Sequence, residues 1–249
     1  MTKQPLTESA GSGLLPQNID EAFRRAEEEA KNRPAEYRKP DSRTTVAVNH
    51  WEQVVPRRFG EATLASLEAA THDPDNPLPV HIYESVVEWI GKTPPRKNVV
   101  IIGEVGVGKS WLAAALCRET AERYGWINEY VSVQRMFLEN NQAVGRTGGL
   151  GSLERYVRAH CLVLDDVGVA RAVLTEAEEN MLSLVINERW LAERVTIVTT
   201  NLTLEDFKVY VGKRILDRLS DPVALIELWG KTRRVASRTP VENTGEEVL

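Results

Sequence analysis

Residues 98–116, NVVIIGEVGVGKSWLAAAL, constrain the fold of this chain more than any other stretch. A short apolar run ends at Gly103, and the spacing G-x-x-x-x-G-K-S follows and closes on Ser110. The next residues, 111–116, have the composition of a helix. A strand, a glycine-rich loop and a helix in this order predict a phosphate-binding loop.

The residue types in this loop match the chemistry of holding a phosphate. Gly103, Gly106 and Gly108 let the backbone wrap closely around an oxyanion, and the loop N–H groups and the helix N-terminus attract negative charge. Lys109 supplies a mobile positive charge for the β- and γ-phosphates, and the Ser110 hydroxyl is a ligand for Mg²⁺. A glycine turn that carries Lys-Ser by coincidence is the alternative, but the flanking strand and helix favour a nucleotide site.

Length and composition favour one sizeable α/β core. Of the 249 residues, 42% are hydrophobic and 27% are charged, which is typical of a globular protein. The formal net charge of −5 disfavours a dedicated duplex-DNA binder, which usually carries a surplus of basic residues. Cys117 and Cys161 lie in apolar sequence and are expected to be buried free thiols. Because the chain has no basic-then-apolar leader and no long apolar run, a cytoplasmic location is expected.

The first part of the chain is polar and interrupted by prolines. Residues 1–16 are expected to form a loose tail, and residues 19–32 a helix with a narrow apolar stripe. Such a helix is either solvated or docks a partner, and the sequence alone leaves both open. Pro34 and Pro40 indicate a linker, and ordered structure is expected from Trp51 onward.

Helical and strand patterns alternate along the rest of the chain. Periodicity predicts helices at 64–70, 80–90, 111–124, 134–141, 153–159, 174–194 and 204–219. Apolar runs predict strands at 99–102, 130–133, 161–164, 195–200 and 223–228, and residues 144–151 are expected to form a glycine-rich loop. This alternation favours a parallel sheet that is covered on both faces, with ligands at the carboxyl ends of the strands.

Three polar residues follow later strands. Asp165 and Asp166 close the apolar run 161–164, a pattern in which the first acid holds Mg²⁺ through its water shell and the second polarises the attacking water. Solvated acids at a strand end are the alternative. Asn201 follows the strand 195–200, where it is placed to hold the lytic water or contact the γ-phosphate, although an Asn there is more often a turn former. In a parallel sheet all three lie beside the phosphate loop.

In chain order, the segments VVIIGEVGVGKSWLAAAL, LVLDDVG, INERW, VTIVTTNL and RILDRL resemble the AAA+ ATPases of the DnaC/IstB group, which are replicative-helicase loaders and transposition helper ATPases. The resemblance covers residues 56–234 and includes PRRFGEATL. It implies a three-layer P-loop fold with a five-stranded parallel sheet, no separate helical lid and a small helical N-terminal region. The implied organisation is an N-terminal tail and partner-docking region at 1–50, an AAA+ ATPase domain at 51–238 and a flexible acidic tail at 239–249.

The resemblance also implies ATP and Mg²⁺ as cofactors and assigns roles to single residues. Asp166 matches the catalytic-base position, Asn201 the sensor-1 position, and Arg218 the arginine finger that reaches the γ-phosphate of a neighbouring subunit. Arg214 is another candidate for the last task. The residues implied in nucleotide binding are Gly103, Glu104, Val105, Gly106, Val107, Gly108, Lys109, Ser110, Trp111 and Arg234, and those implied in Mg²⁺ binding are Ser110 and Asp165.

The first functional hypothesis that the resemblance implies is an ATP-dependent helicase loader. Such a protein binds a DnaB-like replicative helicase through its N-terminal region, helps place it on single-stranded DNA, and works as a homo-oligomer with ATP between subunits. Residues 1–75 contain ten Lys and Arg against thirteen Asp and Glu, which favours a protein partner over a phosphate backbone for this region. Candidate contacts for single-stranded DNA are Ser132, Arg135, Arg146, Arg155 and Arg158, with ordinary solvated arginines as the alternative.

Two other functions stay open. A transposition helper ATPase that assembles on duplex DNA and recruits a transposase has the same ATPase module, but favours a basic N-terminal domain. A small-molecule P-loop kinase uses the same phosphate loop, but needs neither Asn201 nor the RILDRL segment.

Overall fold

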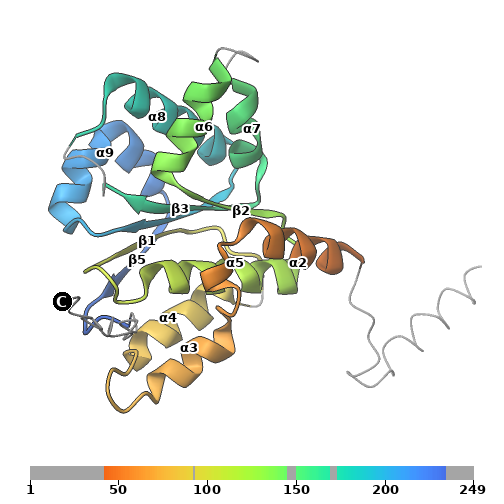
Figure 1. Ribbon diagram of the computed structural model, residues 1–249, viewed down its shortest axis with the longest axis vertical. Coiled ribbons are helices and arrows are strands. Elements are labelled where there is room, and N and C mark those ends of the chain that lie inside the picture. The colour runs from red at the N-terminus through yellow and green to blue at the C-terminus, as the bar shows by residue number, and fades with distance from the viewer. Residues whose placement is uncertain (1–41, 92, 145–149, 169–172, 234–249) are drawn as a thin grey trace, which may run out of the picture. The chain divides into compact units, whose positions relative to one another are not determined.

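A computed structural model gives the fold of the chain and describes residues 42–91, 93–144, 150–168 and 173–233. The helices in this part are α2 (Ser42–Val54), α3 (Leu64–Thr71), α4 (Val80–Ile90), α5 (Lys109–Tyr124), α6 (Val133–Val144), α7 (Leu150–Arg158), α8 (Glu176–Leu191) and α9 (Leu204–Leu219), with a 3₁₀ helix, η2, at Arg57–Phe59. The strands are β1 (Asn98–Gly103), β2 (Asn128–Ser132), β3 (Cys161–Val167), β4 (Val195–Thr200) and β5 (Val223–Leu228). The order of strands and helices agrees with the sequence analysis (Figure 1).

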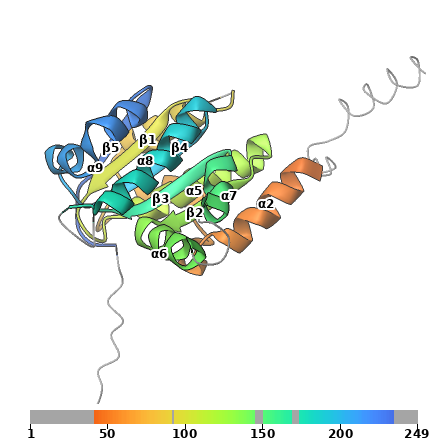
Figure 2. The ribbon, with the colours of Figure 1, turned by 90° about the horizontal axis from the view of Figure 1, so that it is seen from above.

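The five strands form one parallel sheet in the order β2-β3-β4-β1-β5. Every residue of β1 and of β4 is buried, because a parallel sheet of this kind is covered on both faces. The pairing of β1 with β4 runs from Val99–Ile197 to Ile102–Thr200, so the two strands end side by side. The segments that follow β1, β3 and β4 therefore meet at one edge of the sheet (Figure 2).

Helices cover both faces of the sheet and form two hydrophobic clusters. Helices α2 to α5 pack against one face around Trp51, Leu112 and Ile197, and helices α6 to α9 pack against the other around Met136, Val185 and Phe207 (Figure 1). This confirms the predicted three-layer α/β fold with a five-stranded parallel sheet. The described residues after β5, 229–233, contain no further helix, in line with the expected absence of a separate lid.

Helix α2 begins earlier than the sequence analysis expected. Order was expected from Trp51 onward, but α2 starts at Ser42, and the described residues from Ser42 onward cluster as one compact unit. The reason is packing, because Ala47 and Trp51 lie on the same face of α2 and are 0% and 1% exposed. The expected helix at 19–32 and the tail at 239–249 lie outside the described residues.

Several element ends differ from the predicted ones. Strand β2 begins at Asn128 rather than at residue 130, because Asn128 Nδ2 donates to the carbonyl of Cys117 (2.7 Å) and anchors the strand start on α5. Helix α7 begins at Leu150, inside the segment expected to be a loop; residues 145–149 of that segment lie outside the described part. Helix α9 is interrupted at Gly212, whose φ of 73° only glycine adopts readily.

A fully buried cation, Arg189 of α8, ties three elements together. Its guanidinium donates to Thr196 Oγ1 (2.9 Å), to the carbonyls of Tyr156 (2.6 Å) and Ala159 (2.8 Å), and to the carbonyl of Val195. Burial lowers the pKa of Arg189 to about 10, so the side chain remains charged at neutral pH. Arg189 therefore satisfies carbonyls at the end of α7 and at the start of β4 that would otherwise be buried without a donor.

The substitution Arg189→Met is expected to lower the free energy of unfolding by about 3 kcal/mol, because it leaves buried carbonyls unpaired. Urea denaturation followed by circular dichroism measures this loss. The matched control is Arg96→Met, since Arg96 pairs with Glu193 on the surface, where the two side chains are 84% and 81% exposed. A midpoint for Arg189→Met equal to that of the control would contradict the structural role.

The two cysteines are buried and free, as expected. Cys117 of α5 and Cys161 of β3 are each 0% exposed, and their sulfur atoms lie 3.4 Å apart in a thiol hydrogen bond. Burial, followed by the Cys161 partner, raises the pKa of the Cys117 thiol well above its ordinary value. Both side chains thus act as small hydrophobic groups of the core.

Within the described ranges, every helix is too short or too polar to cross a membrane.

Candidate nucleotide-binding site

The phosphate loop runs from the end of β1 to the start of α5, where the sequence predicts it. At two positions of the loop, other residues come so close that only glycine fits. A Cβ at Gly103 would lie 2.0 Å from the carbonyl oxygen of Leu228, and one at Gly106 (φ 89°) would lie 2.2 Å from Thr232 Oγ1. The loop is therefore packed against β5 and the segment after it, and larger side chains at these positions would push the loop away.

Lys109 is the first residue of α5 and is only 5% exposed. Its Nζ donates to the carbonyls of Gly103 (2.9 Å) and Glu104 (2.7 Å), so the loop itself holds the ammonium group at its centre. The N-terminus of α5 points into the same loop and adds the positive end of the helix dipole. The loop thus concentrates positive charge at a place where the backbone can wrap around a phosphate.

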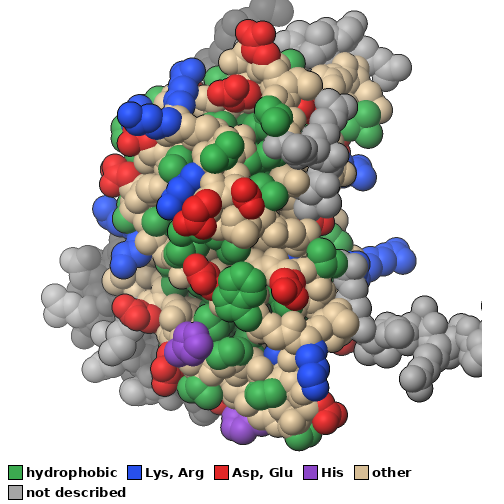
Figure 3. Space-filling model, turned by 90° about the vertical axis from the view of Figure 1, so that its left-hand side faces the viewer, with side chains coloured by type: hydrophobic (Ala, Val, Ile, Leu, Met, Phe, Trp, Pro, Cys, Tyr) green, Lys and Arg blue, Asp and Glu red, His purple; other side chains and the backbone are tan. Residues whose placement is uncertain are grey.

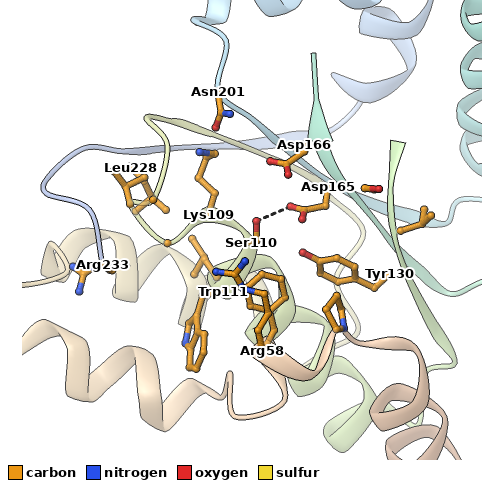
Figure 4. A pocket seen from close by; sticks show the side chains of 18 of the residues that line it. Arg58, Lys109, Ser110, Trp111, Tyr130, Asp165, Asp166, Asn201, Leu228 and Arg233 are labelled. Carbon is orange, nitrogen blue, oxygen red and sulfur yellow. Dashed lines mark hydrogen bonds between the residues drawn. The ribbon is translucent and has the colours of Figure 1, made fainter. Parts of the chain in front are cut away.

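Ser110 and Asp165 lie together, as a shared Mg²⁺ site requires. Ser110 Oγ donates to Asp165 Oδ1 at 2.8 Å (Figure 4). Thr199 Oγ1 donates to the same oxygen at 2.6 Å. Asp165 is 7% exposed, so its orientation is fixed by these two hydroxyls in a mostly buried setting. A carboxylate and a hydroxyl oxygen side by side are ligands that suit Mg²⁺.

The sequence analysis missed Thr199, although it lies in the quoted segment VTIVTT. Its hydroxyl both donates to Asp165 and accepts the backbone N–H of Asp166 at 3.0 Å. Strand β3 was expected to end at Leu164 but runs to Val167, and its pairing with β4 shifts register between Leu164 and Val167. Within this irregularity Asp166 has a φ of 57°, in the left-handed region, which turns it relative to a regular strand residue.

A cavity of about 1340 Å³ collects the predicted residues. The site residues from the sequence analysis that line it are Val105, Gly106, Val107, Gly108, Lys109, Ser110, Trp111, Asp165, Asp166 and Asn201. In Figure 4 the side chains of Lys109, Ser110, Asp165 and Asp166 gather around one space, with Asn201 close to the end of Lys109. Gly103 and Glu104 contribute through the carbonyls that bind Lys109.

Arg234, a predicted site residue, lies outside the described residues. The preceding residue, Arg233, which the sequence analysis did not name, lines the cavity. The backbone N–H of Arg233 donates to the carbonyl of Gly106 (2.8 Å), and its guanidinium lies 3.8 Å from Asp73 Oδ2.

Arg218 lies at the end of α9 and does not line the cavity of its own chain. Its guanidinium stacks over the ring of Trp190 at 4.0 Å and pairs with Asp217 at 2.9 Å, and the side chain is 34% exposed. Its Nε is buried without a hydrogen-bond partner among the described residues. Arg214, one turn earlier, is exposed. Neither arginine lines the cavity of its own chain.

The segment before α3 and the first turn of α3 form another wall of the cavity. Arg58, Phe59 and Ser66 line it together with Trp111, whose Nε1 donates to Ser66 Oγ at 3.1 Å. The Phe59 ring meets the Trp111 ring edge-to-face with centroids 6.5 Å apart. The quoted segment PRRFGEATL thus supplies part of the site, although the sequence analysis assigned none of its residues to nucleotide binding.

The arginines named as DNA candidates are paired with glutamates. Arg135 and Arg155 both bind Glu139, which also accepts a hydrogen bond from Tyr156, and Arg158 pairs with Glu154. Partial burial works to raise the pKa of Glu139, but hydrogen bonds from Tyr156 and Arg135 and the charge of Arg155 hold it below its ordinary value. Glu139 therefore stays ionised and offsets both arginines. Arg146 lies outside the described residues.

The fold and the site together define a phosphate-loop nucleotide-binding domain of the three-layer α/β class. Residues 84–239, more than half of the chain, match the family described as IstB-like ATP binding protein. The chain therefore belongs to the IstB-like ATP-binding family, in agreement with the resemblance to the DnaC/IstB group of AAA+ ATPases.

Relatives and solved structures agree with this assignment. The chain is 34% identical over 116 residues to the insertion sequence IS1162 ATP-binding protein of Pseudomonas fluorescens, covering 46% of this chain and 47% of that protein. It is 33% identical over 158 residues to the insertion sequence ATP-binding protein y4pL of Sinorhizobium fredii, covering 59% of each. The chain thus spans about half the length of the curated relatives it matches.

Among solved structures, the fold is similar to that of the DnaC helicase loader, with a TM-score of 0.60 and 21% identity over 70% of this chain and 99% of that one. It is also similar to DnaI, with a TM-score of 0.56 and 22% identity over 74% of this chain and 100% of that one. At these identities the likeness concerns the fold alone.

Proposed function

We propose that the chain hydrolyses ATP with the help of Mg²⁺. The observation that carries this proposal is the cluster in which Ser110 and Thr199 both donate to Asp165, next to the loop that holds Lys109. In the proposed site Lys109 binds the β- and γ-phosphates, and Ser110 and Asp165 hold the metal, which supplies charge stabilisation when bound. Asp166 orients and deprotonates the attacking water, and Asn201 contacts it or the γ-phosphate.

We also propose that the site is completed by a neighbouring copy. An arginine finger is needed to stabilise the charge that develops on the transferred phosphoryl group, yet the described cavity receives neither Arg218 nor Arg214 from its own chain. Arg218 is the better candidate, because Trp190 and Asp217 hold its guanidinium in a defined place while a third of the side chain stays exposed. Hydrolysis then depends on assembly into a homo-oligomer.

For the cellular role we propose a helicase loader that docks on a DnaB-like replicative helicase and helps place it on single-stranded DNA. The acidic balance of residues 1–75 supports a protein partner, and the fold likeness to DnaC and DnaI is compatible with it. The second candidate is a transposition helper that assembles on duplex DNA. It is favoured by the names of the relatives, which are insertion-sequence ATP-binding proteins.

Direct DNA binding by the described surface has weaker support than partner binding. The candidate arginines on α6 and α7 share Glu139 and Glu154 as counterions, so their net charge is small. On the face shown in Figure 3, acidic and basic side chains are interspersed rather than gathered into a basic patch. We therefore propose that any contact with single-stranded DNA depends on the oligomer, in which a few cations per subunit repeat along the strand.

The test of the cellular role is a pull-down of the replicative helicase from the same cell. We expect the full chain to retain the helicase in the presence of ATP, and a variant that lacks residues 1–41 to lose it. The deletion ends at 41 because α2 begins at Ser42 and packs into the ATPase module. The matched control is the binding of fluorescent ATP, which the deletion should not change. Failure of the full chain to retain the helicase, together with ATP-dependent binding to duplex DNA, would favour the transposition helper.

A further inference from the structure

The hydroxyl of Tyr130 is buried and has no partner at normal hydrogen-bond distance and angle among the described residues, and its polar neighbours are Asp165 and Ser110. Tyr130 lies in β2, and only 9% of the residue is exposed. Buried side-chain hydroxyls nearly always have a partner, because an unpaired one loses its hydrogen bonds to water and regains none. A buried hydroxyl without such a partner therefore needs an explanation, for example a bound group that forms the missing hydrogen bond.

The ring of Tyr130 is held firmly by two aromatic neighbours. Its centroid lies 5.8 Å from that of Phe59 in η2 and 6.2 Å from that of Trp51 in α2. These contacts, and the pairing of β2 with β3, fix the direction in which the hydroxyl points. The oxygen cannot turn to solvent to find a partner without breaking this packing.

The hydroxyl points into the nucleotide cavity, toward Ser110 and Asp165 (Figure 4). Burial, followed by the charge of Asp165 and its side-chain interaction, raises the pKa of Tyr130. The residues here fit a hydrated magnesium ion, since the Ser110 hydroxyl and a carboxylate oxygen of Asp165 lie 2.8 Å apart and the Tyr130 hydroxyl faces them. Magnesium in proteins usually keeps several of its waters, and those waters need hydrogen-bond partners.

We propose that Tyr130 is a positioning residue for the metal, which hydrogen-bonds to the hydration shell of the magnesium ion held by Ser110 and Asp165. This inference rests on the proposed Mg²⁺-dependent ATPase function and adds to it a residue that the sequence motifs do not include. Partners of this kind orient the groups that bind a metal, and their loss typically weakens metal binding about 10- to 100-fold. Because Trp51 and Phe59 hold the ring, the same contact links helix α2 to the metal site.

The test uses Tyr130→Phe, which removes the oxygen and keeps the ring. We expect the apparent affinity for Mn²⁺, measured by titration into the protein with a non-hydrolysable ATP analogue, to fall about 10-fold. Affinity for the same analogue in EDTA should not change. The melting temperature of the protein without ligand should stay the same or rise, because the variant no longer buries an unpaired hydroxyl.

The matched control is Tyr124→Phe at the C-terminal end of α5, the end opposite the phosphate loop. The Tyr124 hydroxyl donates to the carbonyl of Ile90 at 2.6 Å, so its removal should lower the melting temperature and leave the Mn²⁺ affinity unchanged. Equal Mn²⁺ affinity in Tyr130→Phe and the wild type would overturn the inference. A lower melting temperature together with an equal loss of affinity for the ATP analogue in the presence and absence of metal would overturn it as well. Absence of metal-dependent nucleotide binding in the wild type would remove the proposed ATPase function itself.

Discussion

The substitution Lys109→Ala is expected to lower the affinity for ATP by about 100-fold, or about 2.7 kcal/mol. Lys109 is the one cation at the centre of the loop that the sequence motif requires, and its Nζ is already within 3 Å of two loop carbonyls. Charge-assisted hydrogen bonds to phosphate are about twice as strong as neutral ones, so their loss cannot be replaced by the backbone N–H groups alone. Fluorescence anisotropy with a labelled ATP measures the effect.

The control for Lys109→Ala is Lys208→Ala, an exposed lysine of α9 that does not line the cavity. This variant should bind ATP as the wild type does. Melting temperatures of both variants without nucleotide show whether a loss of binding reflects unfolding. Unchanged ATP affinity in a folded Lys109→Ala variant would contradict the assignment of residues 103–110 as a phosphate loop.

The substitution Arg218→Ala is expected to reduce ATP turnover about 10³-fold while ATP binding is kept. The reason is geometric, because Arg218 stacks on Trp190 at the end of α9 and lies outside the lining of its own cavity. In the proposed arrangement it acts on a nucleotide held by a neighbouring copy, so ATP binding by its own chain should not depend on it. Steady-state phosphate release at concentrations that support assembly measures turnover, and anisotropy measures binding.

The same measurements on Arg214→Ala decide between the two arginines of α9. Arg214 is exposed, so this substitution should leave the fold unchanged, and we expect turnover close to that of the wild type. Full turnover in Arg218→Ala combined with a large loss in Arg214→Ala would transfer the finger role to Arg214. Full turnover in both would remove the proposal that α9 completes a neighbouring site.

Much of the fold follows from patterns that act over short distances. The structure of residues 98–110 can be predicted from their sequence, because the strand, the glycine-rich loop and the helix start each depend on residues within this segment. The parallel sheet follows from the alternation of apolar runs with amphipathic helices, since strands in such an order need helical crossovers. The meeting of Asp165, Asp166 and Asn201 at the loop follows in turn, because carboxyl ends of parallel strands share one edge.

The features that the sequence did not predict depend on contacts between distant segments. Thr199 reaches Asp165 because of the register in which β3 pairs with β4 and the irregularity after Leu164. No local sequence pattern reveals either feature. The pairing of Arg135 and Arg155 through Glu139 depends on how α6 packs against α7. The early start of α2 depends on the burial of Ala47 and Trp51, whereas the prolines just before this segment indicate a linker.

The place of Arg233 at the site has the same origin, because it depends on the hydrogen bond from its backbone N–H to the carbonyl of Gly106. The site therefore consists of a locally specified loop and a shell of residues placed by tertiary packing. The proposed arginine finger requires in addition that a second copy of the chain packs beside the site.

The central claim, that ATP is hydrolysed between two copies of the chain, is tested most directly by mixing two inactive variants. Asp166→Asn lacks the proposed base but keeps Arg218, and Arg218→Ala lacks the finger but keeps Asp166. Each alone should show almost no turnover. When the two are mixed in equal amounts, we expect turnover to return to a substantial fraction of the wild-type rate, because some sites then combine Asp166 of one chain with Arg218 of its neighbour. A mixture that remains as inactive as the separate variants would contradict a shared site.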